Sequence, residues 1–217
     1  MVKFNEFLVF QDIVAPLIAL LLGVLLFYIK KRKVYYPDNL LFYFLICQAT
    51  LNTFAPILQS KSINNHLVYH LNCLITVIIF TTYFLRSLHY KETIFIGLIV
   101  FLVFWLINII WIQPYYTFNS YSYSLGAFLI VLYSLLNFRE LIKRMPTQKI
   151  LSLKDFWILA GLLTYFGSCF FIFISYNYLS EIDAKNVGIL WKIHNVFLSL
   201  GCIIFLKAIS CKQWIPK

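Results

Sequence analysis

The sequence predicts an all-α membrane protein, a bundle of seven transmembrane helices with the N-terminus outside and the C-terminus in the cytoplasm. Three observations predict this fold. The chain of 217 residues is 62% hydrophobic and only 12% charged, which is about half the charged fraction of a soluble domain. Seven apolar stretches, each long enough to cross a bilayer, are separated by short loops. The basic residues alternate between loops, abundant in one and scarce in the next.

The alternation of basic residues sets the predicted orientation. The loops after the first, third and fifth spans, together with the C-terminal tail, carry most of the Lys and Arg: Lys30, Lys31, Arg32, Lys33, Arg86, Lys91, Arg139, Lys143, Arg144, Lys149, Lys154, Lys207, Lys212 and Lys217. The N-terminal tail and the other loops hold only Lys3, Lys61 and Lys185, and Lys192 lies inside the seventh span. Because basic loops stay in the cytoplasm, the N-terminus is predicted to be exported.

The first four spans are bounded by charge and proline signals. The first has Pro16 in its first turn, where proline is tolerated, and ends at the basic residues 30–33. Residues 37–39 cap the second span, and Pro56 ends or kinks it. The third and fourth are continuous apolar runs, and a tight turn at residues 113–114 follows them. The predicted spans of the whole chain are 12–29, 39–58, 66–85, 93–112, 120–138, 155–176 and 187–209.

The ends of the fifth and sixth spans are less sharply marked in the sequence, and the sixth span contains small residues that indicate close helix packing. The fifth continues in helical pattern through residues 139–144 until Pro146, and Ser152 or Asp155 caps the sixth. Small residues on the sixth span let a neighbouring helix approach closely. We therefore expect this span to be central in the bundle. Its small residues are Ala160, Gly161, Thr164, Gly167 and Ser168.

Composition excludes several classes of protein. The seven spans leave too little chain for an extramembrane domain, so residues 1–217 are expected to form a single integral membrane domain. The net charge of +10 is explained by basic residues at cytoplasmic span ends and not by nucleic-acid binding. The five cysteines lack metal-binding spacing and are expected to be reduced packing residues. These features predict an integral membrane protein.

Polar residues within the spans gather, on this topology, in the outer halves, whereas the inner halves are almost purely apolar. Polar side chains in lipid are costly and normally face the bundle interior. We therefore expect an outward-facing polar pocket; the alternative is that these side chains only reach the interface. The residues assigned to the pocket are Asp12, Asn52, His70, Asn108, Ser122, Ser168, Trp191, Lys192 and His194. Lys192 either pairs with Asp12 or extends its ammonium group towards the headgroups.

The tyrosines and histidines allow two further interpretations. Tyrosines at the outer span ends, Tyr123 among them, are interpreted as an interfacial aromatic belt. His66 and His70 are four residues apart and share a helix face, and His194 with Asp12 could complete a zinc site. Because the His-x-x-x-His spacing arises by chance and no His-Glu-x-x-His motif is present, no cofactor is expected beyond this zinc alternative.

Four stretches of the chain resemble a group of small multi-span proteins from Bacteroidetes that are often encoded beside sensor histidine kinases. The shared motifs are Phe156-Trp157, the Gly-Leu-Leu-x-Tyr-Phe run 161–166 and Trp-x-Ile-His at 191–194. The stretches are YHLNCLITVIIFTTYF (69–84), FNSYSYSLGAFLIVLYSLLNF (118–138), DFWILAGLLTYFGSCFFIF (155–173) and LWKIHNVFLSLGCIIFLKAI (190–209). The resemblance implies the fold and origin of the chain, and with them a bacterial cytoplasmic (inner) membrane as its location.

This chain also departs from the pattern of that group. Acidic residues of the group are replaced by Thr76 and Gly126, an arginine by Tyr123, and an asparagine by Leu198, whereas His194 is kept. An activity that depends on the replaced groups is therefore expected to be lost here. The departures leave the expected fold unchanged.

The function expected from these observations is that of a non-enzymatic membrane sensor or accessory module. It would bind in the outer pocket and act through a membrane-bound signalling partner such as a histidine kinase, because its cytoplasmic loops are too short to signal alone. No catalytic residue is assigned. Two alternatives remain, an intramembrane metal-dependent lipid hydrolase and a small-solute carrier. A carrier usually needs a carboxylate at mid-membrane, and the sequence has none there.

Overall fold

The computed structural model describes residues 10–31, 35–144, 150–182 and 187–211, and these residues form helices without any strand. Within the described ranges, seven helices are long and apolar enough to span a membrane. They are α2 (Gln11–Ile29), α3 (Asp38–Ser60), α4 (His66–Ser87), α5 (Lys91–Ile107) with its π-helical continuation η1 (Asn108–Ile112), α6 (Ser120–Arg144), α7 (Lys154–Ile182) and α8 (Val187–Ser210). A short 3-10 turn, η2 (Ile150–Ser152), precedes α7.

Several helices extend past the apolar stretches of the sequence. Helix α3 passes through Pro56 and continues to Ser60, α6 includes residues 139–144, and α7 runs to Ile182. Beyond the apolar core, water can bond to backbone groups, so hydropathy no longer limits the helix. Asp155 lies in the first turn of α7, where a carboxylate is favoured by the helix dipole.

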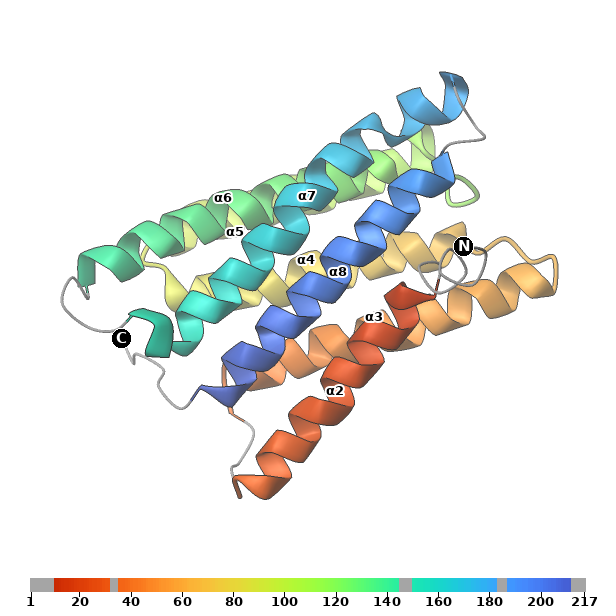
Figure 1. The fold of residues 1–217 in the computed structure, drawn as a ribbon. Coiled ribbons are helices and arrows are strands. Elements are labelled where there is room, and N and C mark those ends of the chain that lie inside the picture. The colour runs from red at the N-terminus through yellow and green to blue at the C-terminus, as the bar shows by residue number, and fades with distance from the viewer. Residues whose placement is uncertain (1–9, 32–34, 145–149, 183–186, 212–217) are drawn as a thin grey trace.

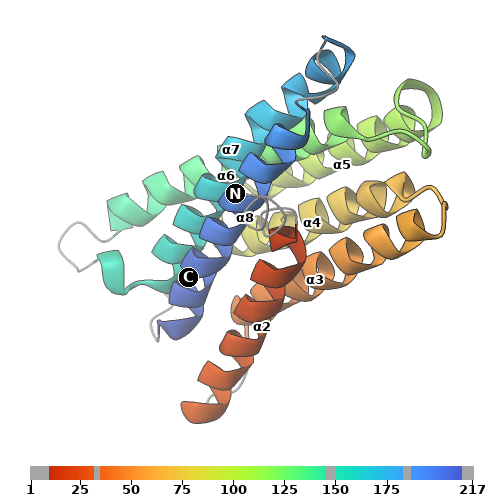
Figure 2. The ribbon, with the colours of Figure 1, turned by 45° about the vertical axis from the view of Figure 1, so that its right-hand side comes forward.

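Six helices form a closed ring, and the seventh lies outside it (Figures 1 and 2). In chain order α2, α3, α4, α6, α7 and α8 each pack against the next, and α8 packs back against α2. Helix α5 lies against α4 and α6 on the outside of the ring. Helices α2 and α5 bury the smallest share of their residues, whereas α4 buries the largest. The exposed apolar side chains of α2 and α5 therefore suit contact with lipid.

The two ends of the bundle differ in charge. The basic end contains the last turns of α2, α4, α6 and α8 and the first turns of α5 and α7, with the described residues Lys30, Lys31, Arg86, Lys91, Arg139, Lys143, Arg144, Lys154 and Lys207. The N-terminal end contains the start of α2, the α3–α4 loop, the η1–α6 segment, the end of α7 and the start of α8. Figure 1 shows the basic end on the left.

Helix α7 packs closely against both neighbours, and Gly161, one of the small residues expected to allow close approach, lies at the contact with α8. A Cβ atom added to Gly161 would lie 2.5 Å from the Phe205 ring of α8. One added to Gly201 of α8 would lie 3.1 Å from Cβ of Tyr165. The buried face runs through Gly161, Tyr165 and Cys169, whereas Ala160, Thr164 and Ser168 are half-buried. Of the predicted small residues, Gly161 therefore lies in the main contact, and Ala160, Thr164 and Ser168 flank it.

Candidate functional site

A small polar cavity, here called the polar chamber, lies inside the ring towards the N-terminal end. All six ring helices contribute side chains to its wall. The space left for the centres of water-sized molecules is about 20 Å³, which suits one water molecule or one ion of similar size. The lining residues are Asp12, Gln48, Asn52, Tyr69, Asn72, Tyr123, Tyr165, Phe173, Trp191 and His194.

One wall of the chamber is a network of amides between α3 and α4. Gln48 and Asn72 bond reciprocally, with Nε2 to Oδ1 at 2.9 Å and Nδ2 to Oε1 at 3.2 Å. Asn52 donates to Oε1 of Gln48 at 3.3 Å and accepts from Asn72 at 3.3 Å. Thr76 accepts from Gln48 at 3.2 Å. All four side chains are at most 5% exposed, so the bundle satisfies these polar groups internally, as a membrane interior requires.

Helix α2 is tied to this wall through its first turn. Asn52 donates from Nδ2 to the backbone oxygen of Asp12 at 3.0 Å. Gln11 accepts from the hydroxyl of Ser199 on α8 at 3.2 Å. Because α2 buries little of its surface, these two bonds help to set its position in the ring.

The opposite wall centres on His194. Its Nε2 lies 3.1 Å from the Tyr165 hydroxyl, and its Nδ1 lies 3.0 Å from Oδ1 of Asn195. This pattern fits a neutral imidazole that donates from Nδ1 and accepts at Nε2. The rings of Trp191 and Phe173 lie 5.1 Å and 5.5 Å from the imidazole. His194 is therefore held by two hydrogen bonds within an aromatic wall.

A second polar cluster lies apart from the chamber, where η1 meets α6. Asn108 donates from Nδ2 to the Ser122 hydroxyl at 2.8 Å and to Oε1 of Gln113 at 3.2 Å. Gln113 donates to the Ser120 hydroxyl at 2.9 Å. These four residues are at most 4% exposed. The π-helical turn at Asn108 makes this cluster possible by turning the chain towards α6.

The structure divides the predicted single pocket between these places. Asp12, Asn52, Trp191 and His194 line the polar chamber, whereas Asn108 and Ser122 bond to each other in the second cluster. The remaining three residues lie elsewhere. His70 is fully buried, with its Nε2 3.2 Å from the backbone oxygen of Thr117. Ser168 donates to the backbone oxygen of Thr164, and Lys192 is half-buried and outside the chamber lining. The candidate side chains therefore lie in the bundle without sharing one cavity.

Two other predicted arrangements, the Asp12–Lys192 ion pair and the zinc site, can also be compared with the structure. The ion pairs found among the described residues join Lys154 to Asp38 and Lys143 to Glu140, not Asp12 to Lys192. Within the same residues, no three His, Cys, Asp or Glu side chains gather as a metal-binding group. His66, the third histidine of the zinc alternative, is half-buried at the start of α4.

Sequence reasoning did not assign six of the chamber residues to the pocket, namely Gln48, Tyr69, Asn72, Tyr123, Tyr165 and Phe173. Tyr123 was assigned to an interfacial belt, but it lines the chamber and stacks on Phe173 at 4.6 Å. The spacing of the amides contained a usable signal. Gln48 and Asn52 are four residues apart on α3, and Asn72 and Thr76 are four apart on α4, so each helix presents a polar stripe. Two such stripes in apolar spans predict a shared interior network.

The chamber is closed on its basic side by four phenylalanines, here called the aromatic plug. Phe44 lies one helical turn from Gln48 on α3, on the side of the basic end. Phe80 lies one turn from Thr76 on α4, on the same side. The Phe44 and Phe80 ring centroids are 5.0 Å apart. The other two members, Phe166 and Phe205, lie 5.5 Å and 6.4 Å from Phe80. All four are at most 4% exposed, so the plug separates the chamber from the basic end.

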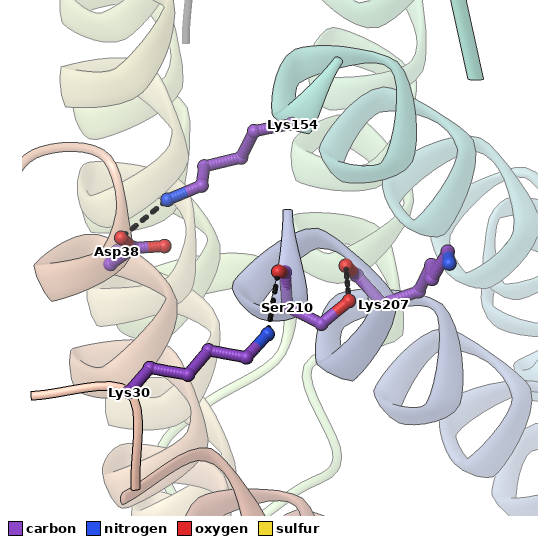
Figure 3. Close-up of polar contacts among 5 residues, drawn as sticks. All are labelled: Lys30, Asp38, Lys154, Lys207 and Ser210. Carbon is purple, nitrogen blue, oxygen red and sulfur yellow. Dashed lines mark hydrogen bonds and ion pairs between the residues drawn. The ribbon is translucent and has the colours of Figure 1, made fainter. Parts of the chain in front are cut away.

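Below the plug, the basic end contains a buried ion pair, formed by two residues that lie just outside the predicted spans. Lys154 Nζ lies 2.5 Å from Oδ2 of Asp38, and both side chains are under 10% exposed (Figure 3). The Tyr83 hydroxyl donates to Asp155 at 3.0 Å. Lys154 and Asp38 appeared as loop and cap residues in the sequence, but their pairing links the start of α3 to the start of α7.

Two further contacts complete the basic end. Lys30 Nζ donates to the backbone oxygen of Ser210 at 2.9 Å (Figure 3), and a cation at a helix C-terminus is favourable. In the α2–α3 loop, Tyr36 donates to the backbone oxygen of Tyr83 at 3.0 Å. Burial, and then the Asp155 carboxylate, raise the pKa of Tyr36, while Arg86 opposes the rise. Tyr36 therefore stays protonated and keeps its donor role.

Comparison of the chain with protein-family models, with curated proteins and with solved structures finds no match. The functional interpretation therefore depends on the geometry of the chamber, the plug and the basic end.

Proposed function

We propose that this protein is a non-enzymatic membrane sensor or accessory module whose responsive element is the polar chamber. The observation that carries the proposal is that the chamber ends at the aromatic plug and does not continue to the basic end. Polar side chains from six helices surround a space for one small species, and the aromatic plug closes it towards the basic end. A small chamber that ends at the plug suits binding and a change in helix packing better than passage of a solute.

The route from chamber to partner is proposed to run through the plug to the basic end. Phe44 and Phe80 lie one turn below the amide network on the same two helices, and Tyr83 lies nearly one turn below Phe80. A change in the spacing of α3 and α4 at the chamber would therefore reach the Tyr83–Asp155 bond and the nearby Lys154–Asp38 pair. Packed interiors transmit such shifts because they have few voids.

The proposal places the protein in a bacterial cytoplasmic membrane with the basic end in the cytoplasm. The concentration of Lys and Arg at that end supports this orientation. The resemblance noted in the sequence supports a histidine kinase as the partner, and the short described loops of the basic end support action through a partner and not alone.

A site-specific crosslinking experiment in the native membrane tests the proposal. A photo-crosslinking amino acid replaces Arg139, an exposed residue of α6 at the basic end, in an otherwise unchanged chain and in a chain with His194→Ala. We expect one defined partner in the unchanged chain and at least a threefold change in crosslinking yield in His194→Ala. The matched control is Ile193→Ala, because Ile193 is 41% exposed and adjacent to His194.

The controls separate signalling from folding. Membrane abundance and detergent-extracted melting temperature are measured for each variant, and only variants within the range of the unchanged chain are compared. Failure to recover a defined partner, or equal yields in all three chains, would contradict the sensor proposal.

A further inference from the structure

We infer that the polar chamber binds a single monovalent metal cation of sodium size, coordinated by the carboxylate of Asp12 and neutral oxygens of the wall. This inference rests on the proposed function, since it names the ligand of the same chamber. It is drawn from three features of that chamber, which are its size, its charge and the oxygens that surround it.

The size of the chamber restricts the ligand to one small species. About 20 Å³ is available to the centres of water-sized molecules, which is little more than one such molecule needs. A lipid headgroup, a sugar or an amino acid would require the ring of helices to open. A dehydrated alkali cation fits without rearrangement.

The charge of the lining favours a cation over a water molecule. Asp12 is the acid among the described residues that line the chamber, and no Lys or Arg is among them. Asp12 lies in the first turn of α2, where the helix dipole favours the ionised carboxylate. His194 offers no compensating charge, because its two hydrogen bonds fit a neutral ring. Asp12 is half-buried, and taking its carboxylate partly out of water is costly unless a cation neutralises it.

The remaining wall supplies the kind of ligand that hard cations prefer. The amide oxygens of Gln48 and Asn72 each already accept two hydrogen bonds within the network. Asn52, whose amide oxygen accepts one hydrogen bond, and the hydroxyl-bearing Tyr69 and Tyr123 also line the chamber. Neutral carbonyl oxygens can replace the hydration shell of an alkali ion. One carboxylate with several neutral oxygens matches a single positive charge, whereas a divalent ion would leave excess charge in an apolar surrounding.

Thermal unfolding of the purified full chain in lipid nanodiscs tests the inference. Sodium chloride is exchanged for choline chloride at constant total salt, because choline is too large for the chamber. We expect a saturable rise in melting temperature, about 3–6 °C at a sodium concentration ten times the Kd. Identical curves in the two salts would overturn the inference.

Variants locate the effect. Asp12→Asn should abolish the sodium-dependent rise, and Tyr123→Phe should weaken it by removing one oxygen while keeping the ring. Glu92→Gln is the control, because Glu92 is an exposed carboxylate at the start of α5. If Asp12→Asn does not fold, Tyr123→Phe and Tyr69→Phe decide the matter, and a full sodium response in both would overturn the inference. Binding by the purified chain needs no partner, so this result is independent of the crosslinking outcome.

Discussion

The contact between α7 and α8 can be tested by adding one methyl group at each of two glycines of α7. A Cβ atom at Gly161 would lie 2.5 Å and 2.8 Å from two carbons of the Phe205 ring. That ring is fully buried and lies 5.8 Å from the Phe44 ring, so it has little room to move. A Cβ atom at Gly167 would meet no neighbouring atom within 4 Å.

The two substitutions separate packing from helix propensity. Both Gly161→Ala and Gly167→Ala gain about 1 kcal/mol from the better helix propensity of alanine. Only Gly161→Ala incurs overpacking, which typically costs about 1–3 kcal/mol. We therefore expect Gly167→Ala to be more stable than the unchanged chain, and Gly161→Ala to be less stable than Gly167→Ala by about 1–3 kcal/mol.

Unfolding in mixed micelles, followed by circular dichroism during titration with sodium dodecyl sulfate, measures this difference. Adding Phe205→Leu to Gly161→Ala should recover part of the loss, because a smaller side chain relieves the contact and the two effects are then not additive. Equal shifts for the two alanine variants would refute the packing of α7 against α8 described here.

The remaining predictions concern the amide network and the orientation of the chain. Gln48→Leu should lower the free energy of unfolding by about 1–3 kcal/mol, because it leaves the buried amide of Asn72 without its reciprocal partner. In the same titration Thr50→Val, an exposed position whose hydroxyl bonds only to its own helix, should change little, and equal losses would argue against the network. A reporter fused after Lys217 should be cytoplasmic and one before Met1 exported, and an exported C-terminus would reverse the assigned orientation.

The spans could be predicted from the sequence because a bilayer imposes a length that is visible in one dimension. The predicted span 187–209 and the observed α8 differ by one residue at one end, and the third span begins at His66 in both. The predicted start of α6 at Ser120 also agrees with the structure. These boundaries depend on local hydropathy and local caps, which need no knowledge of neighbouring helices.

The π-helical turn at Asn108 and the buried face of α7 were not visible in the sequence. Both faces of a membrane helix are apolar, so the pattern that marks the interior of a soluble protein is missing. Of the small residues expected at a helix contact, Gly161 does face α8, whereas Ala160 and Ser168 are only half-buried. Which face turns inward depends on the shapes of side chains from other helices.

Long-range pairing likewise required the tertiary structure. The sequence by itself determined that polar residues such as Asn52 and His194 lie within apolar spans, and it favoured an inward position for them because unsatisfied polar groups in hydrocarbon are costly. Only the tertiary structure decided that Asn52 and His194 line one chamber whereas Asn108 belongs to another cluster. Nothing in the sequence predicts that Lys154 pairs with Asp38, 116 residues away. The Coulomb attraction between them depends on a distance that only the packed helices define.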